Sequence, residues 1–435
     1  MWDSFIEAVT KVNDWVNGVV WGLPMIIMIL GTGILLTVRT RVLQVRKFGE
    51  SMSSTIVPAV KDMKKSKKGR DKKAVSQFEA FSAAISGTVG TGNIIGVTSA
   101  ILTGGPGAVL WMWISAFFGM VTNYSENVLG LYYRKKEKDG SFSGGAFYYI
   151  AYGIKQRWLG MLAAIFCLLA AVGMSGVQTN KITGSYTSVL NNDSAAVKLI
   201  IGGIVAFLAA VVIIGGIKRI GRIASMLVPF MSLLFIAMAF VIIGKNYTAI
   251  PDTFRLIFTS AFSSKAVAGG VGGFAFSQII KKGLARGVFS NEAGLGSSVI
   301  AHSASETREP VKQGLWGIFE VFFDTFVICT LTALVILTTN IGSGAYQNGT
   351  FFGTTDAAGN FAGASDSATA LSAFSSNLGT FGTVTFLIIL PLFAFTTVLA
   401  WSYYGEKAVD FCFHHLPESK RKIPVLIFKI IFILL

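Results

Sequence analysis

The sequence predicts an all-α polytopic membrane protein, and three observations support that prediction. Of the 435 residues, 52% are hydrophobic and 14% are charged, whereas a soluble globular domain carries about 25% charged residues. The mean hydropathy is +0.62. The apolar residues gather in runs of about 20, the length that a helix needs to cross about 30 Å of hydrocarbon. Together these features exclude a soluble enzyme, a disordered protein and a nucleic-acid-binding protein.

Nine apolar runs are long enough to span a membrane. They lie near 18–38, 79–102, 106–133, 157–180, 197–216, 224–244, 266–283, 315–339 and 379–405. A tenth run begins at Pro424 and contains only twelve residues before the sequence stops at Leu435. Twelve residues cannot span the hydrocarbon, so the chain is interpreted as truncated within its tenth span, with at least one further helix expected beyond it. We expect residues 1–435 to form a single transmembrane domain.

Basic residues orient these spans, because Lys and Arg concentrate in cytoplasmic loops. The segment 39–76 contains twelve of them. Placing it inside leaves 30 of the 37 Lys and Arg residues on the cytoplasmic side, including Lys281, Lys282 and Arg286. The stretch 340–376 contains none and is predicted to be an external loop. The net charge of +15 is therefore a signal of topology in a plasma (inner) membrane, with the N-terminus outside.

The basic segment has a second interpretation, in which residues 61–73 bind RNA or anionic lipid. A solvated cytoplasmic loop is simpler and is preferred, so membrane lipid is an expected partner and nucleic acid is not. The three cysteines and three histidines are too few and too widely spaced to predict a disulfide framework, a metal cluster or a membrane enzyme.

Two spans contain glycine clusters that disfavour a continuous helix, at 86–96 and at 269–274. Each glycine costs about 1 kcal/mol relative to alanine inside a helix. Unwound backbone survives at membrane depth where it is buried in protein or lines a wet cavity, and there its carbonyls bind cations and its N–H groups bind carboxylates. The two spans are five apart and run in opposite senses. They predict an inverted repeat, 79–244 and 266–435, after one extra helix at 18–38.

The first glycine cluster has two other interpretations. Gly92 and Gly96 also form a small-xxx-small face for helix packing. Gly87, Gly90 and Gly92 superficially suggest a phosphate-binding loop, but such a loop follows a strand, and these residues lie within an apolar span. We therefore set the phosphate interpretation aside.

Polar residues within spans are costly and mark a transport pathway. Asn93 follows the first glycine cluster, Gln178 lies late in the fourth span, and Thr396 and Thr397 are adjacent in the ninth. Neighbouring hydroxyls and released carbonyls suit Na⁺, a hard cation that binds oxygen ligands. For the threonines, the alternative is a hydrogen bond to the preceding helical turn. For Trp401, the alternative is a position at the membrane interface or in packing.

Four carboxylates lie in or near the predicted spans and would support proton coupling if they relayed protons. Glu79 and Glu126 lie near helix ends, where solvation is the simpler interpretation, and Glu320 is placed in the eighth span. Asp324 lies deeper in that span, and the sequence assigns it no role.

Four motifs resemble the alanine or glycine:cation symporter family, also called sodium:alanine symporters. They are Gly90-Thr91-Gly92-Asn93-Ile94, the run 104–119 that begins Gly104-Gly105-Pro106-Gly107, the run 286–297 that begins Arg286-Gly287-Val288-Phe289, and Trp401-Ser402-Tyr403-Tyr404-Gly405-Glu406-Lys407. Leu110 departs from the family pattern, where phenylalanine is usual. The missing final helices are a second departure.

The resemblance implies an eleven-helix protein whose last ten helices adopt the leucine-transporter fold. It also implies an amino-acid pocket. Its members by the family pattern are Asn93, Gln178, Phe274 and Trp401, with the backbone of Gly90, Thr91, Gly92 and Gly273. In such a pocket, N–H groups hold the substrate carboxylate, amide side chains hold the ammonium, and the two rings enclose a methyl-sized side chain.

The resemblance further implies a Na⁺ site between the first and eighth helices of the fold. Matched onto this chain, its ligands are the hydroxyls of Thr396 and Thr397 and the carbonyls of Ser86, Val89 and Phe393.

The sequence therefore predicts a secondary active symporter, not an enzyme, that imports alanine or glycine with Na⁺ by alternating access. No organic cofactor is expected. One alternative is an H⁺-coupled transporter of the same fold, whose uptake would follow pH rather than sodium. A second is an ion channel, which would conduct continuously.

Overall fold

The computed structural model describes residues 2–55, 75–138, 140–190, 192, 194–262, 270–344 and 366–434. The regular elements in this part of the chain are helices and one small antiparallel hairpin, in which Lys135 pairs with Ser143 and Lys136 with Phe142; Val75 and Ser305 form an isolated parallel bridge. The main elements are α1 (Trp2–Val20), α2 (Leu23–Arg39), α3 (Leu43–Arg46), α5 (Gln77–Thr88), η1 (Thr91–Asn93), α6 (Ile95–Gly104), α7 (Ala108–Tyr133), β1 (Lys135–Lys136), β2 (Phe142–Ser143), α8 (Ala146–Gly153), α9 (Arg157–Leu190), α10 (Ala195–Ile213), α11 (Gly216–Lys245), η2 (Tyr247–Ala249), α12 (Ile250–Ala261), α13 (Gly270–Asn291), α14 (Ser298–His302), α15 (Pro310–Val321), the π-helical η4 (Phe322–Cys329), α16 (Thr330–Gly342), α17 (Asp366–Cys412) and α18 (Glu418–Leu434).

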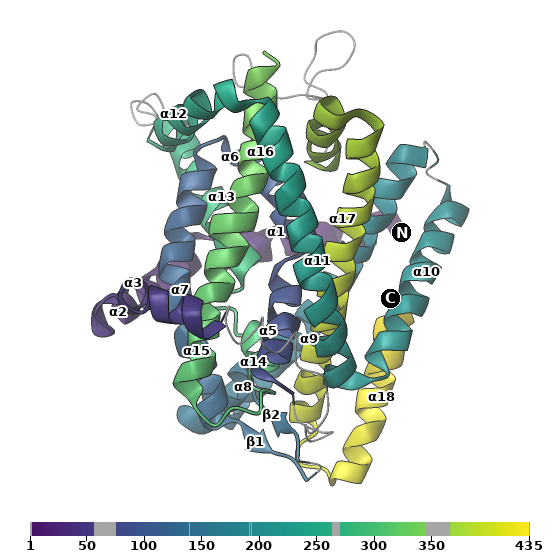
Figure 1. Ribbon diagram of the computed structural model, residues 1–435. Coiled ribbons are helices and arrows are strands. Elements are labelled where there is room, and N and C mark those ends of the chain that lie inside the picture. Colours follow the sequence, from purple (N-terminus) through teal and green to yellow (C-terminus); the bar gives the residue numbers. More distant parts are fainter. Residues whose placement is uncertain are drawn as a thin grey trace.

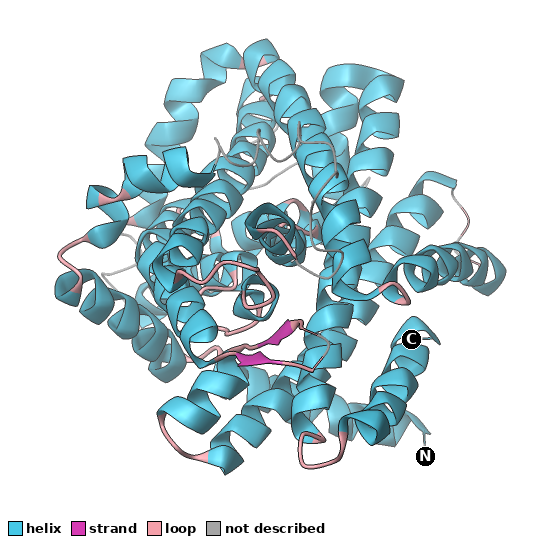
Figure 2. Cartoon of the chain, turned by 60° about the horizontal axis from the view of Figure 1, so that its bottom comes forward, coloured by secondary structure: helices cyan, strands magenta, loops and turns pink. Residues whose placement is uncertain are grey.

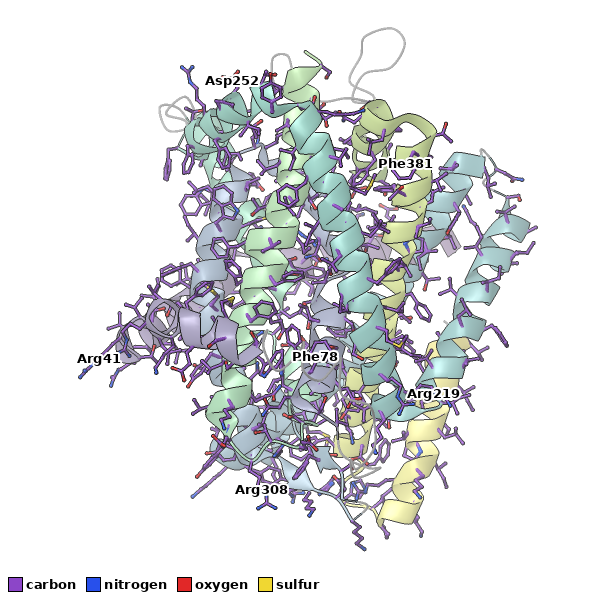
Figure 3. The ribbon with its side chains drawn as sticks, viewed as in Figure 1. Arg41, Phe78, Arg219, Asp252, Arg308 and Phe381 are labelled. Carbon is purple, nitrogen blue, oxygen red and sulfur yellow. The ribbon has the colours of Figure 1, made fainter. Side chains whose placement is uncertain are left out.

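The prediction of an all-helical polytopic membrane protein is confirmed. Within the described residues, six helical stretches are long and apolar enough to cross a membrane, and the bent pair α5–α6 makes a seventh. The long helices run alongside one another as a bundle (Figure 1). Large apolar side chains remain exposed, including Phe381 at 65%, which is labelled in Figure 3, and Leu199 at 75% and Phe230 at 55%. Such a surface suits lipid rather than water.

The two ends of the bundle differ in the segments that they carry. The β1–β2 hairpin, α8 and α14 lie at one end, and α12 lies at the other (Figures 1 and 2). Arg219 and Arg308, from segments predicted to be cytoplasmic, lie toward the hairpin end, whereas Asp252 lies at the opposite end (Figure 3). This grouping agrees with the predicted alternation of the loops. The end that faces the cytoplasm stays a prediction.

The second span is broken where the glycine cluster predicted a break. Helix α5 ends at Thr88 and α6 begins at Ile95, and the two axes differ by 53°. Helix α5 lies between two apolar clusters: Ile85 and Val89 belong to one with Phe393, and Ala84 belongs to the other with Tyr404. Close packing rather than exclusion of water holds such helices together in lipid. The break is therefore fixed in the middle of the bundle.

The predicted extra helix at 18–38 corresponds mainly to α2, and the structure interrupts it near its start. The structure has α1 ending at Val20 and α2 beginning at Leu23. Pro24 in the first turn of α2 has no N–H to continue the helix from α1, and proline is favoured at that position. In Figure 1, α1 and α2 run across the long helices rather than along them, and α2 contacts α7 and α13.

The second glycine cluster does not produce the predicted break in the described residues. Gly269 lies outside them, and α13 is helical from Gly270 through Asn291. The helix also continues eight residues beyond the predicted end of this span at 283. Glycine lowers helix propensity without forbidding a helix, and at membrane depth a helix satisfies every backbone group within one segment.

Two later boundaries also differ from the prediction. The external loop predicted at 340–376 contains a helix, because α17 begins at Asp366; residues 345–365 lie outside the described chain. Gly379, with φ of 58°, marks a kink inside α17, a conformation that glycine adopts readily. The tenth span begins at Glu418 rather than Pro424. An apolar run marks the part of a helix that fits in hydrocarbon, and the helix continues through polar residues beside it.

Candidate functional site

The break between α5 and η1 frees backbone carbonyls. In a continuous helix, the Gly90 N–H would bond to the Ser86 carbonyl. It donates instead to Asn93 Oδ1 at 2.9 Å. The Asn93 N–H, which would bond to the Val89 carbonyl, donates to the Gly90 carbonyl at 3.1 Å. The carbonyls of Ser86 and Val89 thus lose their usual partners, and both belong to the predicted cation site.

Helix α9 brings Gln178 to the break, as the sequence predicted for the substrate site. The Thr91 hydroxyl donates to Gln178 Oε1 at 2.7 Å. A Cβ atom on Gly90 would lie 3.4 Å from Gln178 Nε2, so the amide lies directly beside the unwound backbone. Gly90, Thr91 and Gln178 therefore form one continuous polar surface at this depth.

Helix α17 places Thr397 against the same break. A Cβ on Gly90 would lie 2.5 Å from Thr397 Oγ1. The Thr397 hydroxyl donates to the Phe393 carbonyl at 3.0 Å, which is the bond to the preceding turn weighed above. A hydroxyl that donates one bond keeps its lone pairs as acceptors, so this bond leaves Thr397 able to face a cation.

Thr396 is oriented differently from its neighbour. Its hydroxyl also donates to the Phe393 carbonyl, at 3.1 Å, and it lies 3.7 Å from Met231 Sδ on α11. The structure therefore gathers Ser86, Val89 and Thr397 around the break more directly than it does Thr396.

Asn93 connects the break to a second irregular helix. Its Nδ2 donates to Asp324 Oδ1 at 2.5 Å and lies 3.4 Å from Cys329 Sγ. The Thr325 hydroxyl donates to Asp324 Oδ2 at 2.9 Å. Asp324 belongs to the π-helical segment η4, and π-helical turns occur frequently at functional sites. The amide of Asn93 thus holds the break together and bridges it to a buried carboxylate.

The sequence assigned no role to Asp324, although it carried a signal. Asp324 is fully buried in the middle of the span formed by α15, η4 and α16. An ionisable residue at that depth is a candidate functional residue by itself. The π-helical turn that aims it at Asn93 had no counterpart in the sequence pattern.

A cavity of about 580 Å³ follows α6 from the break toward the end of that helix. Its lining includes Thr91, Gly92, Gly96, Gln178, Lys181, Lys281, Lys282 and Arg286. The prediction that Lys281, Lys282 and Arg286 lie at the end of the span or beyond it is therefore wrong, because all three lie within α13; the side of the membrane that they face stays a prediction. A Cβ on Gly104, which ends α6, would lie 2.9 Å from Lys282 Cβ. In this span the three charged side chains line a polar cavity along the helix and do not mark its end. Charged residues within membrane spans commonly face such a cavity.

Trp401 and Phe274 were predicted to enclose the substrate. Trp401 is 5% exposed and packs edge-on against Tyr404, with the ring centroids 5.3 Å apart, and it does not line the cavity along α6. The side chain of Phe274 lies outside the described residues, and Gly273 is known only as part of the α13 backbone. The structure thus brings together the predicted residues of α5, η1 and α9 with Thr397 of α17, and it leaves Trp401 apart from them.

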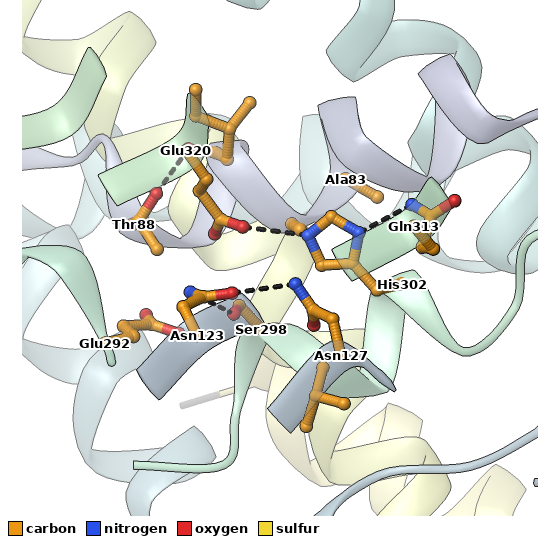
Figure 4. A network of polar contacts seen from close by, with 12 residues as sticks. Ala83, Thr88, Asn123, Asn127, Glu292, Ser298, His302, Gln313 and Glu320 are labelled. Atoms are coloured by element: carbon orange, nitrogen blue, oxygen red, sulfur yellow. Dashed lines mark hydrogen bonds and ion pairs between the residues drawn. The ribbon is translucent and has the colours of Figure 1, made fainter. Parts of the chain in front are cut away.

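A second buried polar network is drawn in Figure 4, and its helix α14 lies toward the hairpin end of the bundle (Figure 1). His302 of α14 contacts Glu320 Oε2 through Nε2 at 2.8 Å and Gln313 Nε2 through Nδ1 at 2.7 Å. Nearby, Asn123 of α7 donates to the Ser298 hydroxyl at 3.3 Å. These bonds join α7, α14 and α15.

The network predicts a pH dependence of stability. Burial lowers the pKa of His302 from 6.5 to about 3, so unfolding takes up a proton below pH 6.5. The stability contributed by the neutral His302 is therefore complete above pH 6.5 and falls as the pH falls toward 3. Between pH 7 and 5 the expected loss from this residue is about 2 kcal/mol. Thermal unfolding of purified His302→Gln should show a smaller change over this interval than wild type; parallel curves would contradict the assignment.

The matching family model identifies the chain. A membrane-crossing helical bundle with a broken helix, released backbone groups and a cavity leading to them defines a membrane transporter rather than an enzyme. The model described as the sodium:alanine symporter family matches residues 6–435. The chain belongs to this family of sodium-coupled amino-acid symporters, as its motifs predicted.

Individual relatives and a solved structure agree with that membership. The sodium/alanine symporter AgcS of Methanococcus maripaludis is 38% identical, over 99% of this chain and 87% of its own length. The probable sodium/glutamine symporter GlnT of Bacillus subtilis is 35% identical, over 94% of this chain and 77% of its own. The crystal structure of MhsT in complex with L-phenylalanine is 15% identical and has a TM-score of 0.57, covering 84% of this chain and 79% of that one. It shows that the fold is of the leucine-transporter type.

Proposed function

We propose that the protein imports a small neutral amino acid, alanine or glycine, together with Na⁺ across the plasma membrane by alternating access. The observation that carries this proposal is the break at 89–94, where the carbonyls of Ser86 and Val89 lose their helical partners opposite the Thr397 hydroxyl. Oxygen ligands of this kind suit a hard cation. The names of the relatives include both alanine and glutamine, so the choice of a small substrate is part of the proposal.

The proposed cation site links two parts of the bundle that would move relative to each other. Ser86 and Val89 belong to the first half of the proposed inverted repeat, 79–244, and Phe393 and Thr397 to the second, 266–435. A Na⁺ ion held by both halves stabilises the arrangement in which they meet, and its release favours the other arrangement. Coupling of ion and substrate requires such a difference in affinity between states.

The proposed substrate site adjoins the cation site. The backbone of Gly90, Thr91 and Gly92 forms the start of η1, where the Thr91 N–H donates to Gln178 Oε1 of α9 at 3.4 Å and the Gly90 N–H donates to Asn93 Oδ1 at 2.9 Å. In this proposal the substrate carboxylate replaces the Gln178 oxygen beside the Thr91 and Gly92 N–H groups. Backbone N–H groups at a helix start attract a carboxylate. In this proposal Asn93 shapes the site through its bonds to Gly90 and Asp324, and Phe274 and Trp401 approach when the bundle closes over the substrate.

Uptake by purified protein in liposomes tests the coupling. An inward Na⁺ gradient should accumulate labelled alanine above its external concentration, and replacing Na⁺ with K⁺ or adding a sodium ionophore should abolish accumulation. The control is a second set of liposomes with a pH gradient and no Na⁺. Accumulation that ignores sodium would refute Na⁺ coupling, and continuous ion current without accumulation would indicate a channel.

One observation favours a second candidate, the H⁺-coupled transporter of the same fold. Asp324 is a buried carboxylate bonded to Asn93 at the break, and such a group can carry a proton through a transport cycle. This mechanism requires uptake driven by the pH gradient alone. The same liposome experiment therefore separates the two coupling ions.

A further inference from the structure

We infer that Arg286 binds the carboxylate of the transported amino acid and sets the preference for carboxylates over their uncharged derivatives. This inference rests on the proposed function and deepens it, because it assigns substrate recognition to a residue that the sequence placed in a cytoplasmic segment. Three observations carry it: the position of the guanidinium, its unused donors and the charge of the cavity.

The guanidinium lies directly against the break. A Cβ atom added to either Gly92 or Gly96 would overlap the guanidinium of Arg286. The small face that the sequence suggested for helix packing thus makes room for this side chain instead. Arg286 also lines the cavity beside Thr91 and Gln178. Its charge is consequently presented at the depth of the unwound backbone.

Two nitrogens of the Arg286 guanidinium have no hydrogen-bond acceptor among the described residues. Among the residues that the structure describes, Nε and Nη2 of Arg286 have no hydrogen-bond partner, and both are shielded from solvent. The nearby Asp324 interacts with Arg286 electrostatically, but its two oxygens accept bonds from Asn93 and Thr325. Buried donors without partners are costly. A planar pair of N–H donors matches the two oxygens of a carboxylate.

Neighbouring side chains orient the guanidinium of Arg286 and give the cavity a positive charge that attracts an anion. The ring of Phe289, one turn along α13, lies 5.3 Å from Arg286 Cζ, a geometry that holds guanidinium groups by cation–π attraction. Lys281 and Lys282 line the same cavity. Lys181 also lines it but pairs with Asp366 at 3.5 Å. An excess of positive charge along the cavity raises the local concentration of a substrate that carries a carboxylate.

Comparing alanine with alaninamide tests the assignment, because the two differ only in the group that Arg286 would bind. Na⁺-dependent binding to purified wild-type protein should favour alanine by at least a hundredfold. In Arg286→Gln, alanine affinity should fall at least thirtyfold and the preference should shrink below tenfold. Arg286→Lys keeps the positive charge but lacks the planar pair of N–H donors. Its preference for alanine should therefore lie between those of the wild type and Arg286→Gln. A variant that still prefers alanine a hundredfold overturns the inference.

A second variant, Gly96→Ala, changes the position of the Arg286 guanidinium without removing it. Gly96→Ala should displace the guanidinium and narrow the same preference, whereas Gly176→Ala on α9, where a Cβ meets nothing within 4 Å, should bind like wild type. If Arg286 only balanced the charge of Asp324, Gly96→Ala would leave the preference intact, which would overturn the inference. Wild-type protein that binds no alanine with Na⁺ would overturn the proposed function itself.

Discussion

Replacing Thr397 with valine is expected to raise the Na⁺ concentration for half-maximal alanine uptake at least tenfold. The substitution keeps the shape of the side chain and removes the hydroxyl that lies against Gly90, opposite the released carbonyls of Ser86 and Val89. A tenfold loss corresponds to about 1.4 kcal/mol of binding free energy, a modest value for one oxygen ligand. Uptake measured against a series of Na⁺ concentrations at saturating alanine gives this quantity directly.

Two further variants separate ligation from helix stability. Thr397→Ser should restore sodium dependence because it returns the hydroxyl. Thr383→Val removes an exposed hydroxyl that also bonds to the preceding turn of α17, at 3.4 Å from the Gly379 carbonyl, and it should leave sodium dependence unchanged. Unaltered half-saturation by Na⁺ in Thr397→Val would remove this residue from the cation site.

Asp324 is the second position where a single change should have a large effect. Asp324→Ala would leave the Asn93 amide and the Thr325 hydroxyl without their buried acceptor. Each unpaired buried donor costs about 1–3 kcal/mol, so we expect a clear fall in thermal stability together with loss of uptake. Asp324→Asn keeps the shape and a carbonyl acceptor, and the Thr325 hydroxyl can turn to accept. This variant should fold almost normally while its maximal uptake falls at least tenfold.

Asp324→Ala and Asp324→Asn together separate the effect of the negative charge of Asp324 from the effect of the hydrogen bonds that it accepts. Asp252→Asn removes an exposed carboxylate from the first turn of α12. This variant is the control for the measurements of both thermal stability and uptake. Should Asp324→Asn transport at the wild-type rate, the carboxylate would be only a hydrogen-bond acceptor, and H⁺ coupling through it would be excluded as well.

The sequence predicted the first broken helix well because its signal was local. Several glycines within 86–96, followed by Asn93, disfavour a helix wherever they occur, and the structure breaks there. Gln178 and Thr397 were also chosen correctly as neighbours of the break, but on the family resemblance and on their depth in a span, not on any contact that the sequence could reveal.

The errors arose where a residue's role depends on its three-dimensional surroundings. Arg286 was interpreted as lying beyond the end of its span because a charge usually ends a span, whereas Gly92 and Gly96 of another helix give it space inside the bundle. The second glycine cluster was expected to unwind, yet α13 is helical from Gly270. A sequence pattern indicates how unfavourable a helix is at a given position. It does not reveal which residues of other helices pack there and offset that unfavourable free energy.

The π-helical segment has a consequence for how this protein tolerates insertions and deletions. At the end of η4, the hydroxyl of Thr330, the first residue of α16, donates to the Thr325 carbonyl at 3.1 Å and accepts from the Trp113 indole N–H at 2.8 Å. A π-helical turn holds more residues than an α-helical turn. Removing one residue between 322 and 329 would therefore let the segment close as ordinary α-helix, and α16 would largely keep its direction. The change would instead fall on the side chains within the segment, where Asp324 would turn relative to Asn93.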